Sequence, residues 1–67
     1  MGDYVKRIAV ELEALQCRRD TLVEFFDTPK FASLTYAQQY LLTEQIKAMS
    51  TYLNILEVRL ALETSNG

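Results

Sequence analysis

The sequence contains no histidine and no tryptophan, and it has a single cysteine, Cys17. One cysteine excludes an intramolecular disulfide, and without histidine or a second cysteine the chain has no ligand set for a structural zinc site. One proline and two glycines provide few turns, which argues against an all-β fold. The missing histidine also removes the usual general base near neutral pH. We therefore expect a protein that is not an enzyme and that holds no metal or other cofactor.

The sequence also lacks an excess of basic residues and any long apolar run. Its net charge is −2 at pH 7, whereas proteins that bind DNA or RNA polymers are usually basic. No stretch approaches the ~18 apolar residues of a membrane span, and no signal peptide opens the chain. We expect a cytosolic protein with a lone thiol, no membrane and no polymeric nucleic-acid partner. A small anionic ligand, held by a few local cations, stays open.

The 67 residues are expected to form one domain, and the hydrophobic content of 49% excludes a disordered tail. After Asp3, a candidate N-cap, apolar residues recur at spacings of three and four, with Arg19 in one skipped place. These seam residues are Val5, Ile8, Leu12, Leu15, Leu22 and Phe26. The spacing predicts a helix over about residues 3–26 that packs against another helix.

Residues 27–35 are predicted to connect this helix to the next, because Pro29 biases Thr28 away from the α region. Thr28 and Pro29 also suit the start of a single helical turn, with Thr28 as its N-cap. Phe31 and Leu34 would then plug the open end between the two long helices.

A second long helix is predicted over about residues 36–63. Thr35 and Gln38 form a capping box at its start, and the polar residues 64–67 are expected to fray. Its seam residues are Leu42, Ile46, Met49, Leu53, Leu56 and Leu60. Two helices of similar length with a short linking turn predict an all-α fold, an antiparallel helical hairpin.

The second helix has more apolar surface than one hairpin can bury. Leu41, Ala48, Ile55 and Leu62 recur every seven residues beside its seam, with Tyr52 among them. A long apolar patch of this kind marks an interface. At ~25 cal/mol per Å², sealing several hundred Å² per chain contributes several kcal/mol, which is comparable to the stability of a small domain. We therefore predict an obligate helical oligomer.

The adjacent arginines Arg18 and Arg19 are the strongest basic pair. Arg19 falls at a seam position, where a cation is costly unless it reaches solvent or pairs with an anion. One interpretation is structural, with Arg19 paired with Asp20, Glu24 or a neighbouring chain. The other is an anion site between chains.

A second cluster combines Tyr4 with Lys6 and Arg7. Stacking on a base together with charge on a phosphate is what nucleotide recognition requires. Tyr4 and Arg18 are 14 residues apart, or about 21 Å along one helix, so one small ligand cannot touch both from the same chain. If both residues serve one site, two chains must cross there.

We interpret the other polar or reactive residues as ordinary residues of a helix surface, with no role in catalysis or binding. Cys17 suits a small apolar residue on a helix flank, and Glu11 and Glu13 point in different directions as a solvated face. Glu44 and Lys47 suit a surface pair three residues apart.

A pattern over residues 4–62 carries a resemblance to a known family. Its most specific part is the F-x-x-L link from Phe31 to Leu34, followed by the Q-x-x-x-M-x-x-Y helix of Gln45, Met49 and Tyr52. The chain resembles a family of very small phage-encoded helical proteins. The characterised members of that family are the anti-CBASS cyclic-oligonucleotide sponges.

The resemblance implies a compact hexamer that sequesters cyclic nucleotide messengers of bacterial immunity without cleaving them, in the cytoplasm of an infected host. It implies a cyclic dinucleotide site between paired chains, with Tyr4 as the aromatic residue and Arg18, or alternatively Arg19, as the basic one. It also implies separate cyclic trinucleotide pockets, for which Arg59 is the candidate, while Arg7 belongs to the Tyr4 cluster. The alternative hypothesis is a helical module that binds a host protein and no nucleotide.

Overall fold

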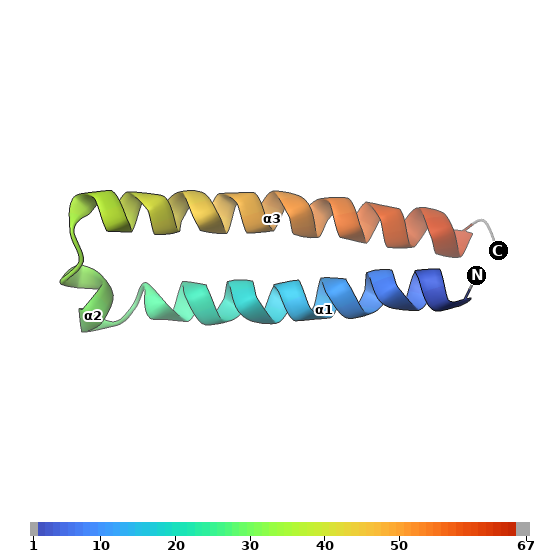
Figure 1. Cartoon of the computed structure of the whole chain (residues 1–67), viewed down its shortest axis with the longest axis horizontal. Coiled ribbons are helices and arrows are strands. Elements are labelled where there is room, and N and C mark those ends of the chain that lie inside the picture. The colour runs from blue at the N-terminus through green and yellow to red at the C-terminus, as the bar shows by residue number, and fades with distance from the viewer. Residues whose placement is uncertain (1, 66–67) are drawn as a thin grey trace.

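The computed structural model describes residues 2–65, among which there is no strand. Helix α1 spans Gly2–Phe25, α2 spans Pro29–Ala32 and α3 spans Tyr36–Ser65. Figure 1 shows α1 and α3 side by side and running in opposite directions, with α2 at the end where the chain passes between them. The molecule is a rod with extents of 49 × 15 × 13 Å. The all-α prediction is confirmed, with a third, short helix in the connection.

The ends of the long helices differ from the sequence prediction in two places. Asp3 is not the N-cap, because it lies in the first turn of α1, where its carboxylate faces the positive end of the helix dipole. Thr64 and Ser65, which are expected to fray, are the last residues of α3, and their hydroxyls donate to the carbonyl oxygens of Leu60 (2.9 Å) and Leu62 (3.2 Å). The predicted fraying of residues 66–67 lies outside the described residues.

Thr28 and Pro29 begin α2 as the sequence predicts. The Thr28 hydroxyl accepts a hydrogen bond from the backbone N–H of Phe31 (3.3 Å) and donates one to the carbonyl of Phe25 (2.6 Å). The ring of Phe31 stacks on Phe26, with centroids 4.2 Å apart, and meets Phe25 edge to face at 6.1 Å. This aromatic cluster fixes α2 against the end of α1 and closes that end of the rod.

Replacing Thr28 with alanine should lower the free energy of unfolding by about 1 kcal/mol, because an N-cap hydroxyl is lost. Thr28→Ser is the matched control, since serine keeps the hydroxyl that makes both hydrogen bonds. Urea denaturation followed by circular dichroism measures the difference. A serine variant as unstable as the alanine variant would contradict a capping role.

The capping box at the start of α3 is also confirmed. The backbone N–H of Thr35 donates to Gln38 Oε1, and the backbone N–H of Gln38 donates to Thr35 Oγ1, both at 3.2 Å. The Gln39 side-chain amide donates to the carbonyl oxygens of Phe31 (3.0 Å) and Leu34 (3.3 Å). These bonds join α3 to the connection, so the turn sets the register between the two long helices.

The core of the rod is small. Ile8, Leu53 and Leu56 are its buried residues, whereas the other seam residues are half-buried. This partial burial arises because each long helix covers the other on one side only. Among residues 2–65, no helix is both long and apolar enough to cross a membrane.

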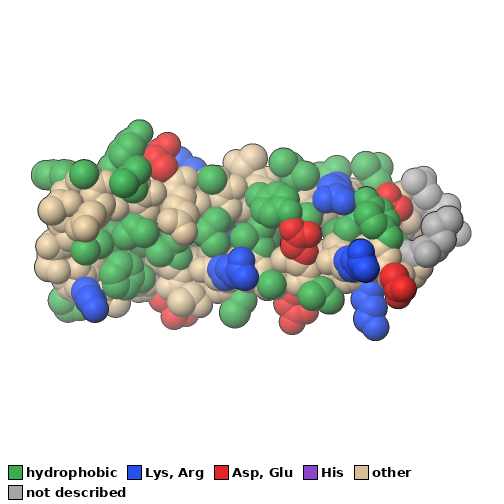
Figure 2. All heavy atoms as spheres, viewed as in Figure 1, with side chains coloured by type: hydrophobic (Ala, Val, Ile, Leu, Met, Phe, Trp, Pro, Cys, Tyr) green, Lys and Arg blue, Asp and Glu red, His purple; other side chains and the backbone are tan. Residues whose placement is uncertain are grey.

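A row of apolar side chains on α3 is left uncovered. Leu41, Ile55 and Leu62 are 64%, 49% and 57% exposed, and Ala48 is exposed as well. We call these four residues the apolar stripe. Figure 2 shows hydrophobic side chains at intervals along the outer edge of α3. The single chain therefore retains the surplus apolar surface that the sequence predicts.

Candidate functional site

Tyr4, near the start of α1, contacts Arg59 of α3. Figure 1 shows the start of α1 at the end of the rod opposite α2. Arg59 Nη2 donates a hydrogen bond to the Tyr4 hydroxyl at 2.8 Å, and the guanidinium carbon lies 5.9 Å from the ring centroid. That separation is within the range of a cation–π contact. The hydrogen bond to Tyr4 is the main cause that raises the pKa of Arg59 above its usual value. An exposed aromatic ring and a permanent cation thus lie side by side.

A second pair of residues joins the same two helices, seven residues further along each of them. The Tyr52 hydroxyl of α3 donates a hydrogen bond to a carboxylate oxygen of Glu11 on α1. Glu11 lies seven residues after Tyr4, and Tyr52 lies seven residues before Arg59, so both pairs are on one flank of the antiparallel helices. Glu11 is exposed, as the solvated-face interpretation expects, and its carboxylate also accepts a hydrogen bond from the opposite helix.

The two polar pairs enclose the tightest part of the core. They delimit residues 4–11 of α1 and residues 52–59 of α3, and these segments contain all three buried residues, Ile8, Leu53 and Leu56. The polar pairs therefore lie over a well-packed base, and their position on the flank is fixed by the seam beneath them.

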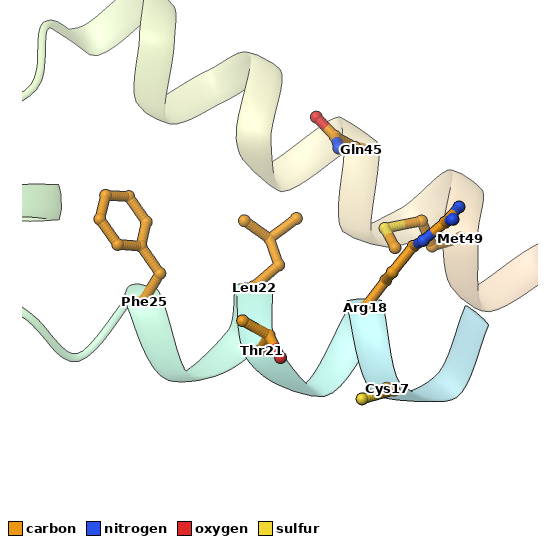
Figure 3. A pocket seen from close by; sticks show the side chains of 7 residues that line it. All are labelled: Cys17, Arg18, Thr21, Leu22, Phe25, Gln45 and Met49. Carbon is orange, nitrogen blue, oxygen red and sulfur yellow. The ribbon is translucent and has the colours of Figure 1, made fainter. Parts of the chain in front are cut away.

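A groove lies on the same flank, seven residues beyond the pair of Glu11 and Tyr52. Arg18, seven residues after Glu11, and Gln45, seven before Tyr52, line a groove of about 540 Å³ between α1 and α3. Leu22 and Phe25 of α1 and Met49 of α3 supply its apolar walls. Figure 3 shows the side chain of Arg18 extending from α1 toward α3, beside Met49. A cation and an amide therefore border an apolar depression that is open to solvent.

The family model that matches this sequence is described as Sequestin, and it covers residues 2–62. The chain belongs to the Sequestin family. This finding confirms the family resemblance proposed from residues 4–62. No curated protein and no solved structure matches the chain. The Sequestin match includes α1, α2 and all of α3 except its last three residues, so it contains both polar pairs and the groove.

The predicted site residues occupy three places in this Sequestin. Tyr4 and Arg59, which the sequence interpretation assigns to separate ligand sites, are in direct contact. Arg18 lines the groove and is far from Tyr4 along the same helix. Arg7 lines a smaller depression of about 350 Å³ near the start of α1.

Arg19 is paired within its own helix. Its Nη2 lies 3.2 Å from Oδ1 of Asp20, and its side chain is 34% exposed. Asp20 is one of the partners that the structural interpretation of Arg19 names. The predicted surface pair of Glu44 and Lys47 is also present, at 3.0 Å.

The residues of the site that the sequence interpretation does not assign to ligand binding include Glu11, Gln45 and Tyr52. The available signal is the seven-residue spacing that Glu11 shares with Tyr4 and Arg18, and that Tyr52 shares with Arg59 and Gln45. No three acidic or thiol side chains within residues 2–65 gather closely enough to hold a metal ion.

The bond between Tyr52 and Glu11 predicts a loss of stability in alkali. The hydrogen bond to Glu11, then burial and the Glu11 charge, raise the pKa of Tyr52, against a smaller opposing effect of Arg59. Because the folded chain holds this proton more tightly than the unfolded chain, the stabilisation is complete below pH ~10. It is lost as the pH rises through the raised folded-state pKa.

We expect the midpoint of thermal unfolding of the wild type to fall more steeply above pH ~10 than that of Tyr52→Phe, which cannot ionise there. Tyr36→Phe is the matched control, because Tyr36 is 91% exposed. Circular dichroism melts at about pH 8 to 11 provide the comparison. Equal alkaline slopes for the wild type and Tyr52→Phe would contradict the prediction.

Proposed function

We propose that this Sequestin binds cyclic di- or trinucleotide messengers of bacterial immunity and sequesters them without cleavage, so that the CBASS effector is not activated. The observation that carries the proposal is the exposed contact between the Tyr4 ring and the Arg59 guanidinium. The family name supports ligand sequestration, and a binding role requires no catalytic base or nucleophile.

Cyclic oligonucleotides combine flat bases with anionic phosphodiesters. An aromatic ring stacks on a base, and arginine donates charge-assisted hydrogen bonds to phosphate oxygens. We assign Tyr4 to base stacking and Arg18 to phosphate binding in a dinucleotide site, with Arg7 as an additional cation beside Tyr4. Arg59 is assigned to a trinucleotide site. Arg19 is the less favoured basic residue, because a ligand must compete with its ion pair to Asp20.

The proposed assembly is a hexamer in the cytoplasm of a phage-infected bacterium. Tyr4 and Arg18 are about 21 Å apart on one helix, so a dinucleotide reaches both only where two chains cross. The apolar stripe on α3 supplies surface for such association, because Leu41, Ile55 and Leu62 are about half exposed or more. The ligand sites then exist only in the assembly.

Native mass spectrometry with a panel of cyclic di- and trinucleotides tests the proposal. We expect six-chain ions that gain nucleotide mass, and chromatography of the denatured complex should recover the nucleotide intact. Linear or hydrolysed products would contradict sequestration without cleavage. The absence of both nucleotide adducts and calorimetric heat at tens of micromolar would overturn the proposed function.

The same apolar stripe supports a second candidate, a module that binds a host protein. Its surface is apolar and open, as a partner helix would require. If this second function is correct, a pull-down with the wild-type protein should recover a specific host protein from lysate, and the wild type should bind no nucleotide in the same panel. Nucleotide binding with no retained host protein would reject it.

A further inference from the structure

Three pairs of residues recur at seven-residue steps along the flank between α1 and α3, and the third pair differs from the others. Arg59 is bonded to Tyr4, and Tyr52 is bonded to Glu11. Arg18 and Gln45, at the next step, make no side-chain hydrogen bond or ion pair within residues 2–65. The donors and acceptors of this third pair are therefore available to a ligand.

The surroundings of this pair match the parts of a nucleotide. Leu22, Phe25 and Met49 form an apolar wall that suits the face of a base. The Gln45 amide presents one acceptor oxygen and a donor NH₂ group, which can pair with the polar edge of a base. Arg18 is a cation without a carboxylate partner among the described residues, and it suits a phosphate. Its charge is complementary to an anionic ligand.

We propose that Gln45 is a specificity-determining residue that reads the base edge of a nucleotide held in this groove, with Arg18 on the phosphate. The inference rests on the proposed nucleotide sequestration and adds a residue of α3 to it. Because the groove is open on its outer side, a second chain can complete the site over the same ligand. Figure 3 shows that the lining residues Gln45 and Met49 belong to α3, while Arg18, Leu22 and Phe25 belong to α1.

Replacing the amide with a carboxylate tests this role, because the two groups differ in their hydrogen bonding. Glutamine pairs with adenine by donating to the ring N7 and accepting from the N6 amino group. Glutamate accepts only, so it loses the bond to adenine N7. Guanine offers two donors, the N1–H and the N2 amino group, and a carboxylate can accept from both. A Gln45→Glu variant should therefore penalise adenine ligands far more than guanine ligands.

Isothermal titration calorimetry of cyclic di-AMP and cyclic di-GMP measures the effect. We expect Gln45→Glu to shift the ratio of the two dissociation constants by about tenfold toward the guanine ligand. The added negative charge weakens both ligands alike and leaves the ratio unaffected. Gln16→Glu is the matched control, since Gln16 is exposed on α1 and is not part of the groove wall. It should leave the ratio unchanged.

The only cysteine of the chain supplies an independent readout of the site. Cys17 is exposed and lines the same groove. Saturating cyclic di-AMP should slow its reaction with a maleimide by about fivefold or more, because access controls the labelling of an exposed thiol.

The possible outcomes distinguish a failure of the proposed function from a failure of the role assigned to Gln45. A wild type that binds no cyclic di- or trinucleotide of the panel overturns the proposed function. A wild type that binds other members of the panel, but neither cyclic di-AMP nor cyclic di-GMP, overturns the inference about Gln45. A wild type that binds, but whose Gln45→Glu variant keeps the same ratio, overturns base reading by Gln45 alone. Ligand binding that leaves the Cys17 labelling rate unchanged places the nucleotide outside this groove and also overturns the inference.

Discussion

Replacing Ile55 with glutamate is expected to dissociate the protein into monomers and to remove its binding of cyclic nucleotides. Ile55 lies in the middle of the apolar stripe, is 49% exposed in the single chain and is not part of the seam between α1 and α3. A carboxylate placed in an apolar interface without a partner costs several kcal/mol. The monomer should keep its helical content, because the buried core is untouched.

Sedimentation velocity at low micromolar concentration, followed by calorimetry with the ligand panel, measures both effects. Asn54→Glu is the matched control, since it adds the same charge at the adjacent exposed position. We expect this control to remain oligomeric and to bind. An Ile55→Glu variant that stays fully assembled would show that the apolar stripe is not the interface.

Replacing Leu56 with alanine should lower the free energy of unfolding by about 2–5 kcal/mol, because it leaves a cavity in the core. The Leu56 side chain is fully buried, and among residues 2–65 only Ile8 and Leu53 approach its degree of burial. So small a core cannot redistribute the loss over many other contacts. We expect a reduced helical signal at room temperature.

Guanidinium titrations at one fixed protein concentration measure this change. Leu56→Met, which nearly conserves volume, should cost less than about 1.5 kcal/mol and serves as the matched variant. A Leu56→Ala variant within about 0.5 kcal/mol of the wild type would show that the seam around this residue does not hold the helices together.

The features that the sequence predicts well are local. A capping box needs only the spacing between Thr35 and Gln38, and the start of α2 needs only Thr28 beside Pro29. The seams of the long helices follow from apolar spacing, because a helix must turn one face toward its partner. The prediction that Asp3 is the N-cap of α1 is wrong, since an acidic residue suits the first helical turn as well as the N-cap position.

The features that the sequence misses depend on how the two long helices are aligned. Tyr4 bonds to Arg59 only because the turn around α2 sets one register, and a shift of one helical turn would present other residues to each other. Glu11 is ambiguous for the same reason, since its partner Tyr52 is 41 residues away in sequence. Residue patterns along one helix contain no information about that distance. The contact between Tyr4 and Arg59, which the sequence interpretation assigns to separate ligand sites, could not be predicted for the same reason.

The position of the core gives the rod two halves of unequal stiffness. All three buried residues lie between the Tyr4–Arg59 and Glu11–Tyr52 pairs, whereas the groove beside Arg18 lies in the half that holds no fully buried residue. Sparse burial lowers the free energy of local opening. One half thus acts as a rigid anchor, and the other can adjust its width by small relative movements of α1 and α3. Under the proposed function, the groove half would adjust its width around a bound nucleotide, while the anchor keeps the fold intact.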